Sequence, residues 1–166
     1  DIVEVHPELA LNRAFIRRAA RKNKPLIITR HPRLRLSHFL ALLREAEDSG
    51  ATRIIIAENA ACGFDLHARA LFDLSKIITL RAETHYPILV DCSRLSRAPK
   101  HVRNLAMAAI AAGADGVLAE FDANATVFST SKSALLLPLQ VQELMRQTHA
   151  LKHTLNALTH LSCFER

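Results

Sequence analysis

Short apolar runs and longer amphipathic stretches alternate along the whole chain. Each apolar run predicts a β-strand, and these runs lie at residues 1–5, 25–29, 53–57, 87–91 and 116–120. Helical spacing of apolar positions between them predicts helices at 9–22, 36–50, a stretch ending near Leu80, 99–113 and 138–160. Gly50 and Gly113 stand where two of these helices are expected to end.

The apolar runs do not alternate with polar residues, which distinguishes them from strands that have one face in water. Strands that are buried on both faces have this pattern, as in a parallel sheet covered by helices. Five successive βα units therefore predict the α/β class. No Pro/Gly-rich linker divides the chain, so we expect residues 1–166 to form a single domain.

Composition agrees with a globular protein, because 49% of the residues are apolar and 23% are charged. The three cysteines Cys62, Cys92 and Cys163 are widely spaced and form no CxxC motif. This argues against a disulfide framework or a zinc ribbon and is typical of a reducing compartment. No apolar run is long enough to cross a bilayer, and the start "DIVEVHPELA" does not resemble a signal peptide. We therefore expect a cytoplasmic protein without a membrane partner.

The net charge of +6 comes largely from two basic clusters, at 17–24 and 30–35. In the first cluster cations interleave with apolar residues at helical spacing, which indicates the solvent face of a helix. The second cluster directly follows a strand, and its role stays open. Aromatic residues make up only 5% and there is no Trp, so little can stack on bases and nucleic-acid binding is not expected. A phosphorylated small molecule is the ligand class that this basic segment favours.

Polar side chains gather where each predicted strand ends. They occur in the segments "HPE" (6–8), "RHPR" (30–33), "ENAACGFD" (58–65), "DCSR" (91–94) and "EFDAN" (120–124). Parallel α/β folds hold their ligand sites at this edge of the sheet. The candidate catalytic residues are therefore Asp91, Arg94 and Glu58.

Several segments, in order and almost without gaps, resemble the C-terminal part of the 3-deoxy-7-phosphoheptulonate (DAHP) synthases. More loosely, they resemble the octulosonate 8-phosphate synthases. The likeness is clearest in "FDLHARALFDLSKIITLRAETHYPILVDCS" (64–93) and "AAIAAGADGVLAEFD" (108–122). "DIVEVHPELALNRAF" (1–15) and "KPLIITRHPRLRLSHF" (24–39) match two earlier family segments. Each match is weak by itself, and their order makes the resemblance specific.

The resemblance implies a TIM (β/α)8-type barrel that condenses phosphoenolpyruvate with erythrose 4-phosphate by means of a divalent metal such as manganese. The likeness starts at about the fourth strand of that barrel, so we expect a partial barrel that lacks the first three strands. Five parallel strands cannot close an eight-stranded barrel and leave two edges and one apolar face open. This predicts a longer polypeptide, a homo-oligomer, a partner chain that completes the barrel, or a different closure of the five units.

The metal ligands of the family are mostly replaced. Arg94 stands at the position of the metal-ligand His, and Ser131 falls at that of the metal-ligand Asp. Glu120 matches the metal-ligand Glu and is a vestigial ligand at most. A single carboxylate does not hold a divalent ion, and a guanidinium repels one, so we expect no metal cofactor.

The cations that hold phosphoenolpyruvate in the family are also replaced, here by Glu8, Thr29 and Asn59. Retained positions are Asn12, Glu58, Arg69 and Asp91. Asn12, Arg69 and Arg30 are the candidate substrate-binding residues, although strand alternation turns Arg30 away from the side of Thr29. Glu58 and Arg69 have the alternative role of a structural ion pair across the rim.

Three hypotheses follow from these substitutions. The first is a relative of the family that no longer catalyses its reaction. The second is an aldolase-type enzyme of changed specificity, in which Arg94 acts as electrophile and Glu120 as its partner or as a general base. The structural alternative for Arg94 is a buried salt bridge with Glu120 and Asp91. Cys92 is either a candidate nucleophile or a small buried apolar residue.

The third hypothesis is an interaction or regulatory module, based on the leucines of the last helix. Leu144, Leu151, Leu155 and Leu158 share one face and either dock a partner helix or pack on the chain's own sheet.

Overall fold

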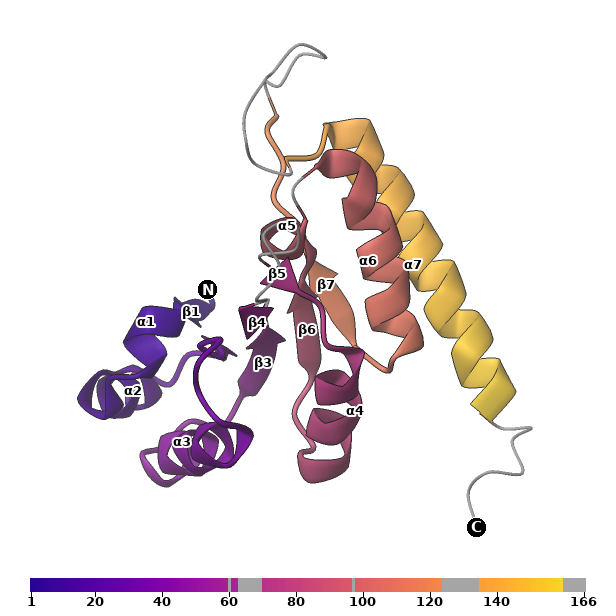
Figure 1. Cartoon of the computed structure of the whole chain (residues 1–166). Helices are drawn as coiled ribbons and strands as arrows, with labels where there is room; N and C mark the ends of the chain where they lie inside the picture. The colour runs from indigo at the N-terminus through magenta and orange to yellow at the C-terminus, as the bar shows by residue number, and fades with distance from the viewer. Residues whose placement is uncertain (60, 63–69, 97, 124–134, 160–166) are drawn as a thin grey trace.

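The computed structural model describes residues 1–59, 61–62, 70–96, 98–123 and 135–159. Five strands in this part of the chain form one fully parallel sheet in the order β1-β2-β3-β6-β7 (Figure 1). These strands are β1 Val3–Val5, β2 Leu26–Thr29, β3 Ile54–Glu58, β6 Ile88–Asp91 and β7 Gly116–Leu118. All five predicted strands are confirmed, and so is the α/β class.

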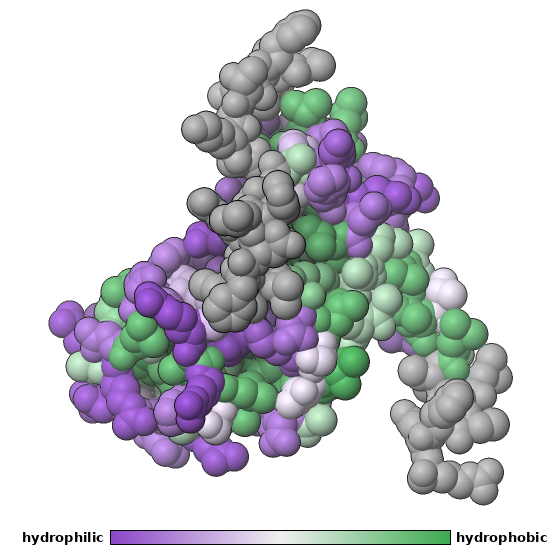
Figure 2. All heavy atoms as spheres, viewed as in Figure 1, coloured by the Kyte–Doolittle hydropathy of each residue, from purple (hydrophilic) through white to green (hydrophobic). Residues whose placement is uncertain are grey.

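Helices follow the strands and cover one face of the sheet (Figure 1). They are α1 Pro7–Ala10, α2 Arg13–Ala20, α3 Leu36–Asp48, α4 Leu74–Glu83, α5 Cys92–Leu95, α6 Pro99–Ala111 and α7 Pro138–Thr159. The long helix α7 packs along α6 at one end of the sheet (Figure 1). Hydrophilic surface is prominent over α1 to α3 and over the upper ends of α6 and α7, and apolar surface is exposed between these regions and along the lower part of α6 and α7 (Figure 2). No helix among the described residues has the length and apolar character that crossing a membrane requires.

Burial alternates along the strands and separates the two faces of the sheet. On the helix-covered face the strand residues are almost fully buried, and these are Val5, Leu26, Ile28, Ile54, Ile56, Ile88 and Val90. Their neighbours Ile27, Ile55 and Leu89 point the other way and are only partly buried. The second face of the sheet is therefore apolar and less covered than the first.

The structure corrects the predicted helix 9–22, which is two helices. α1 ends at Ala10, and α2 starts at Arg13 after a break at Leu11 and Asn12. The side chain of Asn12 accepts a hydrogen bond from the amide of Phe15 at 3.1 Å and caps α2. An N-cap side chain competes with the helical path of its own backbone, which explains the break.

The segment between β3 and α4 also differs from the prediction of one helical stretch. β4 (Ala61–Cys62) and β5 (Ala70–Leu71) pair antiparallel as a separate two-stranded sheet. Helix α4 begins only at Leu74, where Asp73 caps it by accepting from the amide of Ser75 at 3.1 Å.

Both glycines that were predicted to end helices do so with the same hydrogen-bond pattern. Gly50 has φ +105° and Gly113 has φ +102°, which is the left-handed region that favours glycine. After α3 the amide of Ala51 donates to the carbonyl of Ala46, and after α6 that of Ala114 donates to Ala109, each at 3.0 Å. This is the Schellman pattern, in which the last carbonyls of a helix find donors.

Asp115 ties three elements together at the amino-terminal edge of the sheet. Its carboxylate accepts hydrogen bonds from the amide of Ile88 at 2.9 Å, from Arg81 on α4, and from Lys152 on α7 at 3.1 Å. Partial burial acts to raise the pKa of Asp115, but these three donors outweigh it and hold the pKa below its usual value.

We predict that Asp115→Asn makes stability less dependent on pH. Because the folded-state pKa of Asp115 is lowered, its charge stabilises the fold above the unfolded-state pKa of about 4 and loses this effect as pH falls through the folded-state value. Arg81 and Asp115 are partly exposed, so after allowance for solvent screening the effect at neutral pH is about 1 kcal/mol.

Urea unfolding of both proteins at several pH values measures this difference in free energy of unfolding. Asp48→Asn, an exposed acid at the end of α3, is the matched control. A difference between the wild type and Asp115→Asn that stays constant from neutral pH down to pH 2 would contradict the assigned role.

Candidate functional site

The carboxyl ends of the five parallel strands bring the predicted site residues to one edge of the sheet. Arg30 follows β2, Glu58 ends β3, and Asp91 ends β6. Arg94 lies in the short helix α5 directly after β6, and Glu120 follows β7 by two residues. Asn12 lies on the same side but is exposed and caps α2, which gives it a structural role. Arg69 lies outside the described residues.

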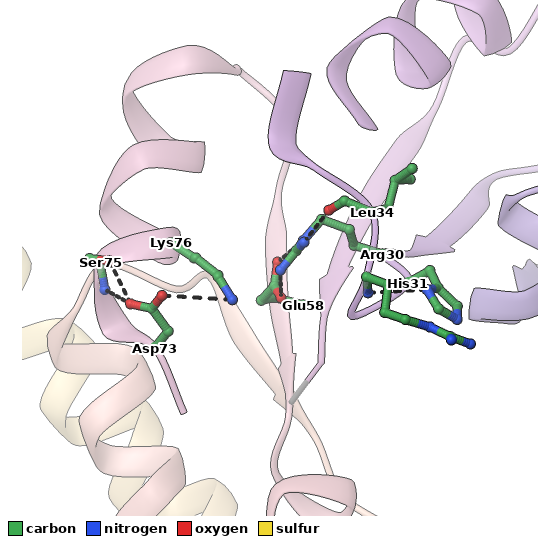
Figure 3. Close-up of polar contacts among 8 residues, drawn as sticks. Arg30, His31, Leu34, Glu58, Asp73, Ser75 and Lys76 are labelled. Atoms are coloured by element: carbon green, nitrogen blue, oxygen red, sulfur yellow. Dashed lines mark hydrogen bonds and ion pairs between the residues drawn. The ribbon is translucent and has the colours of Figure 1, made fainter. Parts of the chain in front are cut away.

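Arg30 and Glu58 form a buried, two-pronged ion pair at this edge (Figure 3). Arg30 Nε donates to Glu58 Oε2 at 2.7 Å, and Arg30 Nη2 donates to Oε1 at 2.6 Å. The two side chains are only 4% and 3% exposed. Arg30 Nη1 also donates to the carbonyl of Leu34 at 2.7 Å, so all three guanidinium nitrogens donate hydrogen bonds within the protein.

The strand register explains why this pair faces the helices. Thr29 is aligned with Ala57, so Arg30 and Glu58 are the next residues along two neighbouring strands. They share a face with Ile28 and Ile56, which are fully buried under the helices. Arg30 therefore points away from the side of Thr29, and both carboxylate oxygens of Glu58 have Arg30 as their partner.

His31 is held next to this pair and has a defined tautomer. Its Nδ1 accepts from the amide of Arg33 at 3.1 Å, so the ring proton lies on Nε2 in the neutral form. Nε2 lies 3.3 Å from Glu8 Oε1 and donates to it. His31 is 5% exposed, and sequence reasoning did not single it out.

Asp91 and Arg94 form a second ion pair, which is more exposed than predicted. Asp91 Oδ1 accepts from the amide of Arg94 at 3.1 Å, and its Oδ2 lies 2.9 Å from Arg94 Nε. The Arg94 side chain is 40% exposed and that of Asp91 is 11% exposed. Burial raises the pKa of Asp91, the Arg94 amide and guanidinium oppose this, and the charges of Glu120 and Glu4 add to it.

Glu120 and Cys92 complete the set of candidates from the sequence. Glu120 is exposed, and its amide donates to Ser93 Oγ at 2.7 Å. Arg94 pairs with Asp91 and not with Glu120, so the predicted salt bridge of three residues is not formed, and Glu120 acts on Asp91 only through its charge.

Cys92 is fully buried, and burial with the nearby charge of Asp91 raises the pKa of its thiol to about 12. This disfavours the thiolate that a nucleophile needs.

Comparison with known proteins identifies the fold and the family. A family model described as the DAHP synthetase I family matches residues 1–157. The chain belongs to this family. A phospho-2-dehydro-3-deoxyheptonate aldolase from Thermotoga maritima is 33% identical over 120 residues, which cover 72% of this chain and 36% of that protein. The chain thus spans about a third of the length of this curated relative.

Two solved structures from Thermotoga maritima share the fold. One is a truncated form of 3-deoxy-D-arabino-heptulosonate 7-phosphate synthase, with a TM-score of 0.84 and 29% identity over 93% of this chain and 59% of that one. The other is phospho-2-dehydro-3-deoxyheptonate aldolase (DAHP synthase), with a TM-score of 0.85 and 29% identity over 93% of this chain and 46% of that one. The five βα units therefore form a partial TIM (β/α)8-type barrel.

The described residues at the DAHP-synthase-like rim do not fit a divalent metal. No group of three His, Cys, Asp or Glu side chains comes together to hold an ion among the described residues. Arg94 places a guanidinium beside Asp91, where it neutralises the carboxylate that an ion needs. Ser131, the predicted replacement for a third ligand, lies outside the described residues.

Sequence reasoning missed the partners of the rim charges rather than the rim itself. It did not pair Arg30 with Glu58, or His31 with Glu8, although each pair comes from strand ends that the sheet order makes neighbours. The available signal was the register, because two charges of opposite sign at equal depth on adjacent strands share a face. It also missed that Thr29 is 3% exposed and that its hydroxyl finds no hydrogen-bond partner within the part of the chain that the structure describes.

Proposed function

We propose that this chain is a DAHP-synthase-like protein that does not itself condense phosphoenolpyruvate with an aldose phosphate. The observation that carries the proposal is the Arg30–Glu58 pair. Arg30 is the sequence neighbour of Thr29, which stands at the position of a family cation, but it points to the helix-covered face and donates to Glu58 and Leu34, so it does not replace that cation. A trianion needs cations that remain free to meet it. Replacement of the other family cations by Glu8 and Asn59 adds to the argument.

A second set of rim residues, which does not fit a divalent metal, also supports the proposed loss of catalysis. In the family the divalent ion is part of the reaction. Here the rim next to β6 holds a fixed cation, Arg94, with Asp91 as its counter-ion. A non-catalytic role, structural or regulatory, follows for the rim as it stands.

One observation favours an enzyme of changed specificity as the second candidate. Arg94 is 40% exposed, so part of its guanidinium remains open to a ligand. In that case Arg94 replaces the metal as the electrophile, and Glu120, which is exposed nearby, acts as the base. The two candidates differ in whether an anion binds in the absence of metal.

Isothermal titration of the folded chain with phosphoenolpyruvate, with and without manganese, tests the proposal. The Thermotoga maritima relative serves as the positive control. We expect no heat of binding in either titration. Binding that requires manganese would overturn the proposal, and binding without manganese that is lost in Arg94→Met would establish the second candidate.

We also infer that the less covered face of the sheet meets another protein surface, either a second copy or a partner chain. Ile27, Ile55 and Leu89 lie on this face and are only partly buried, and Ile2, at the start of the chain, is 56% exposed. A continuous apolar sheet face in water is unstable unless it is covered. The partner would add surface along the face that the helices leave open.

Sedimentation velocity of the purified chain checks this inference. We expect self-association, and we expect Ile55→Lys to reduce it because the new charge lies in the middle of the face. Ile78→Lys, at a 60% exposed position on the outer helix α4, is the control and leaves the association unchanged. A monomeric wild-type chain that binds no apolar dye would show that the face needs no cover.

A further inference from the structure

One hydrogen bond joins two parts of the rim that are not neighbours in the sheet. Arg94 Nη1 lies 3.1 Å from His6 Nε2, although the two residues are 88 positions apart in sequence. Arg94 follows β6 and His6 follows β1, and the sheet order places β2 and β3 between these strands. Three inter-strand steps would separate β1 from β6 by about 14 Å in a flat sheet.

The register shows which side of the sheet this contact belongs to. Glu4 is aligned with Ile27, Thr29 with Ala57, and Ala57 with Leu89. Residues two positions apart on a strand share a face, so Glu4, Thr29, Ala57 and Asp91 all lie on the face that the helices do not cover. His6 continues this series from Glu4.

The upper part of this face is closed to solvent, in contrast to the part below it. Thr29 is 3% exposed and Ala57 is fully buried, whereas Ile27 and Ile55 one step earlier on the same strands are only partly buried. Thr29 and Ala57 belong to β2 and β3, the two strands that lie between β1 and β6, and both have small side chains.

Charge and protonation define the direction of the contact. Arg can only donate, so Nε2 of His6 is the acceptor in this hydrogen bond, which requires the tautomer with its proton on Nδ1. At its other side Arg94 Nε meets Asp91 Oδ2 at 2.9 Å. The guanidinium therefore holds a carboxylate at the end of β6 and an imidazole at the end of β1 at the same time. The side chain of His6 makes no capping hydrogen bond to α1, so this contact is separate from the start of that helix.

We propose that Arg94 is a positioning residue that ties the end of β1 to the end of β6 across the open face and so maintains the curl of the sheet. This goes beyond the proposed loss of catalysis, because it assigns a task to the residue that replaced the family's metal-ligand His. Without this tie, β1 and α1 are held by β2 and α2 and lose this link to β6.

A double-mutant cycle with Arg94→Met and His6→Ala measures the tie in the full chain. Met retains the length of the side chain and removes every donor. We expect the two substitutions to be non-additive by about threefold in the unfolding equilibrium constant, as for partly exposed polar pairs. His6→Gln, which restores an acceptor, recovers most of this coupling, and Arg103→Met on α6 shows none with His6→Ala.

Hydrogen exchange separates a tie from a general loss of stability. In the Arg94→Met variant we expect the amide hydrogens of residues 3–10 to exchange faster, whereas the exchange rates in α3 and α6 stay unchanged. Additive effects in the cycle, or unchanged exchange in residues 3–10, would overturn the proposal. Both measurements are independent of phosphoenolpyruvate, so their result does not depend on whether the chain is catalytically inactive.

Discussion

The carboxyl edge of this sheet depends on one ion pair, because two full charges buried at the ends of neighbouring strands have to neutralise each other. An unpaired buried carboxylate or guanidinium costs several kcal/mol, so Arg30 and Glu58 depend on each other for their place in the fold. Breaking such a pair from one side costs about 3–5 kcal/mol, since the remaining charge stays buried. The bond from Arg30 to the carbonyl of Leu34 extends the constraint to the loop between β2 and α3. That loop in turn holds His31 against Glu8.

This arrangement contributes to the stability of the sheet in this member of the DAHP synthetase I family. Two arginines at the rim have partners within the protein: Arg30 pairs with Glu58, and Arg94 contacts Asp91 and His6. A rim that satisfies its own charges needs no ligand in order to be stable. The same pairing directs Arg30 to Glu58 rather than to a phosphorylated substrate, so it stabilises the fold and also supports the proposed loss of catalysis.

Much of the fold was accessible from the sequence, because parallel strands under helices leave a local signature. Apolar runs without alternation marked all five strands, and Gly50 and Gly113 marked the ends of α3 and α6. The break at Asn12 was missed because apolar spacing continues through a residue whose side chain caps the next helix. The β4–β5 pair was missed because two-residue strands carry no periodic signal. The sequence predicted that the site lies at the carboxyl edge of the sheet. It did not predict which charged residues pair, because pairing can be read only once the register between segments 28 and 88 residues apart is known.

The most direct test of the account is a nitrogen–proton NMR spectrum of the arginine side chains during titration with phosphoenolpyruvate, with Arg30 and Arg94 assigned from the variants Arg30→Lys and Arg94→Met. The account predicts that the Arg30 Nε–H resonance is protected from exchange with water, because it is buried against Glu58, and that phosphoenolpyruvate does not move it. An Arg30 signal that exchanges freely, or that shifts in proportion to bound phosphoenolpyruvate, would show that this guanidinium is open to substrate and would contradict the account.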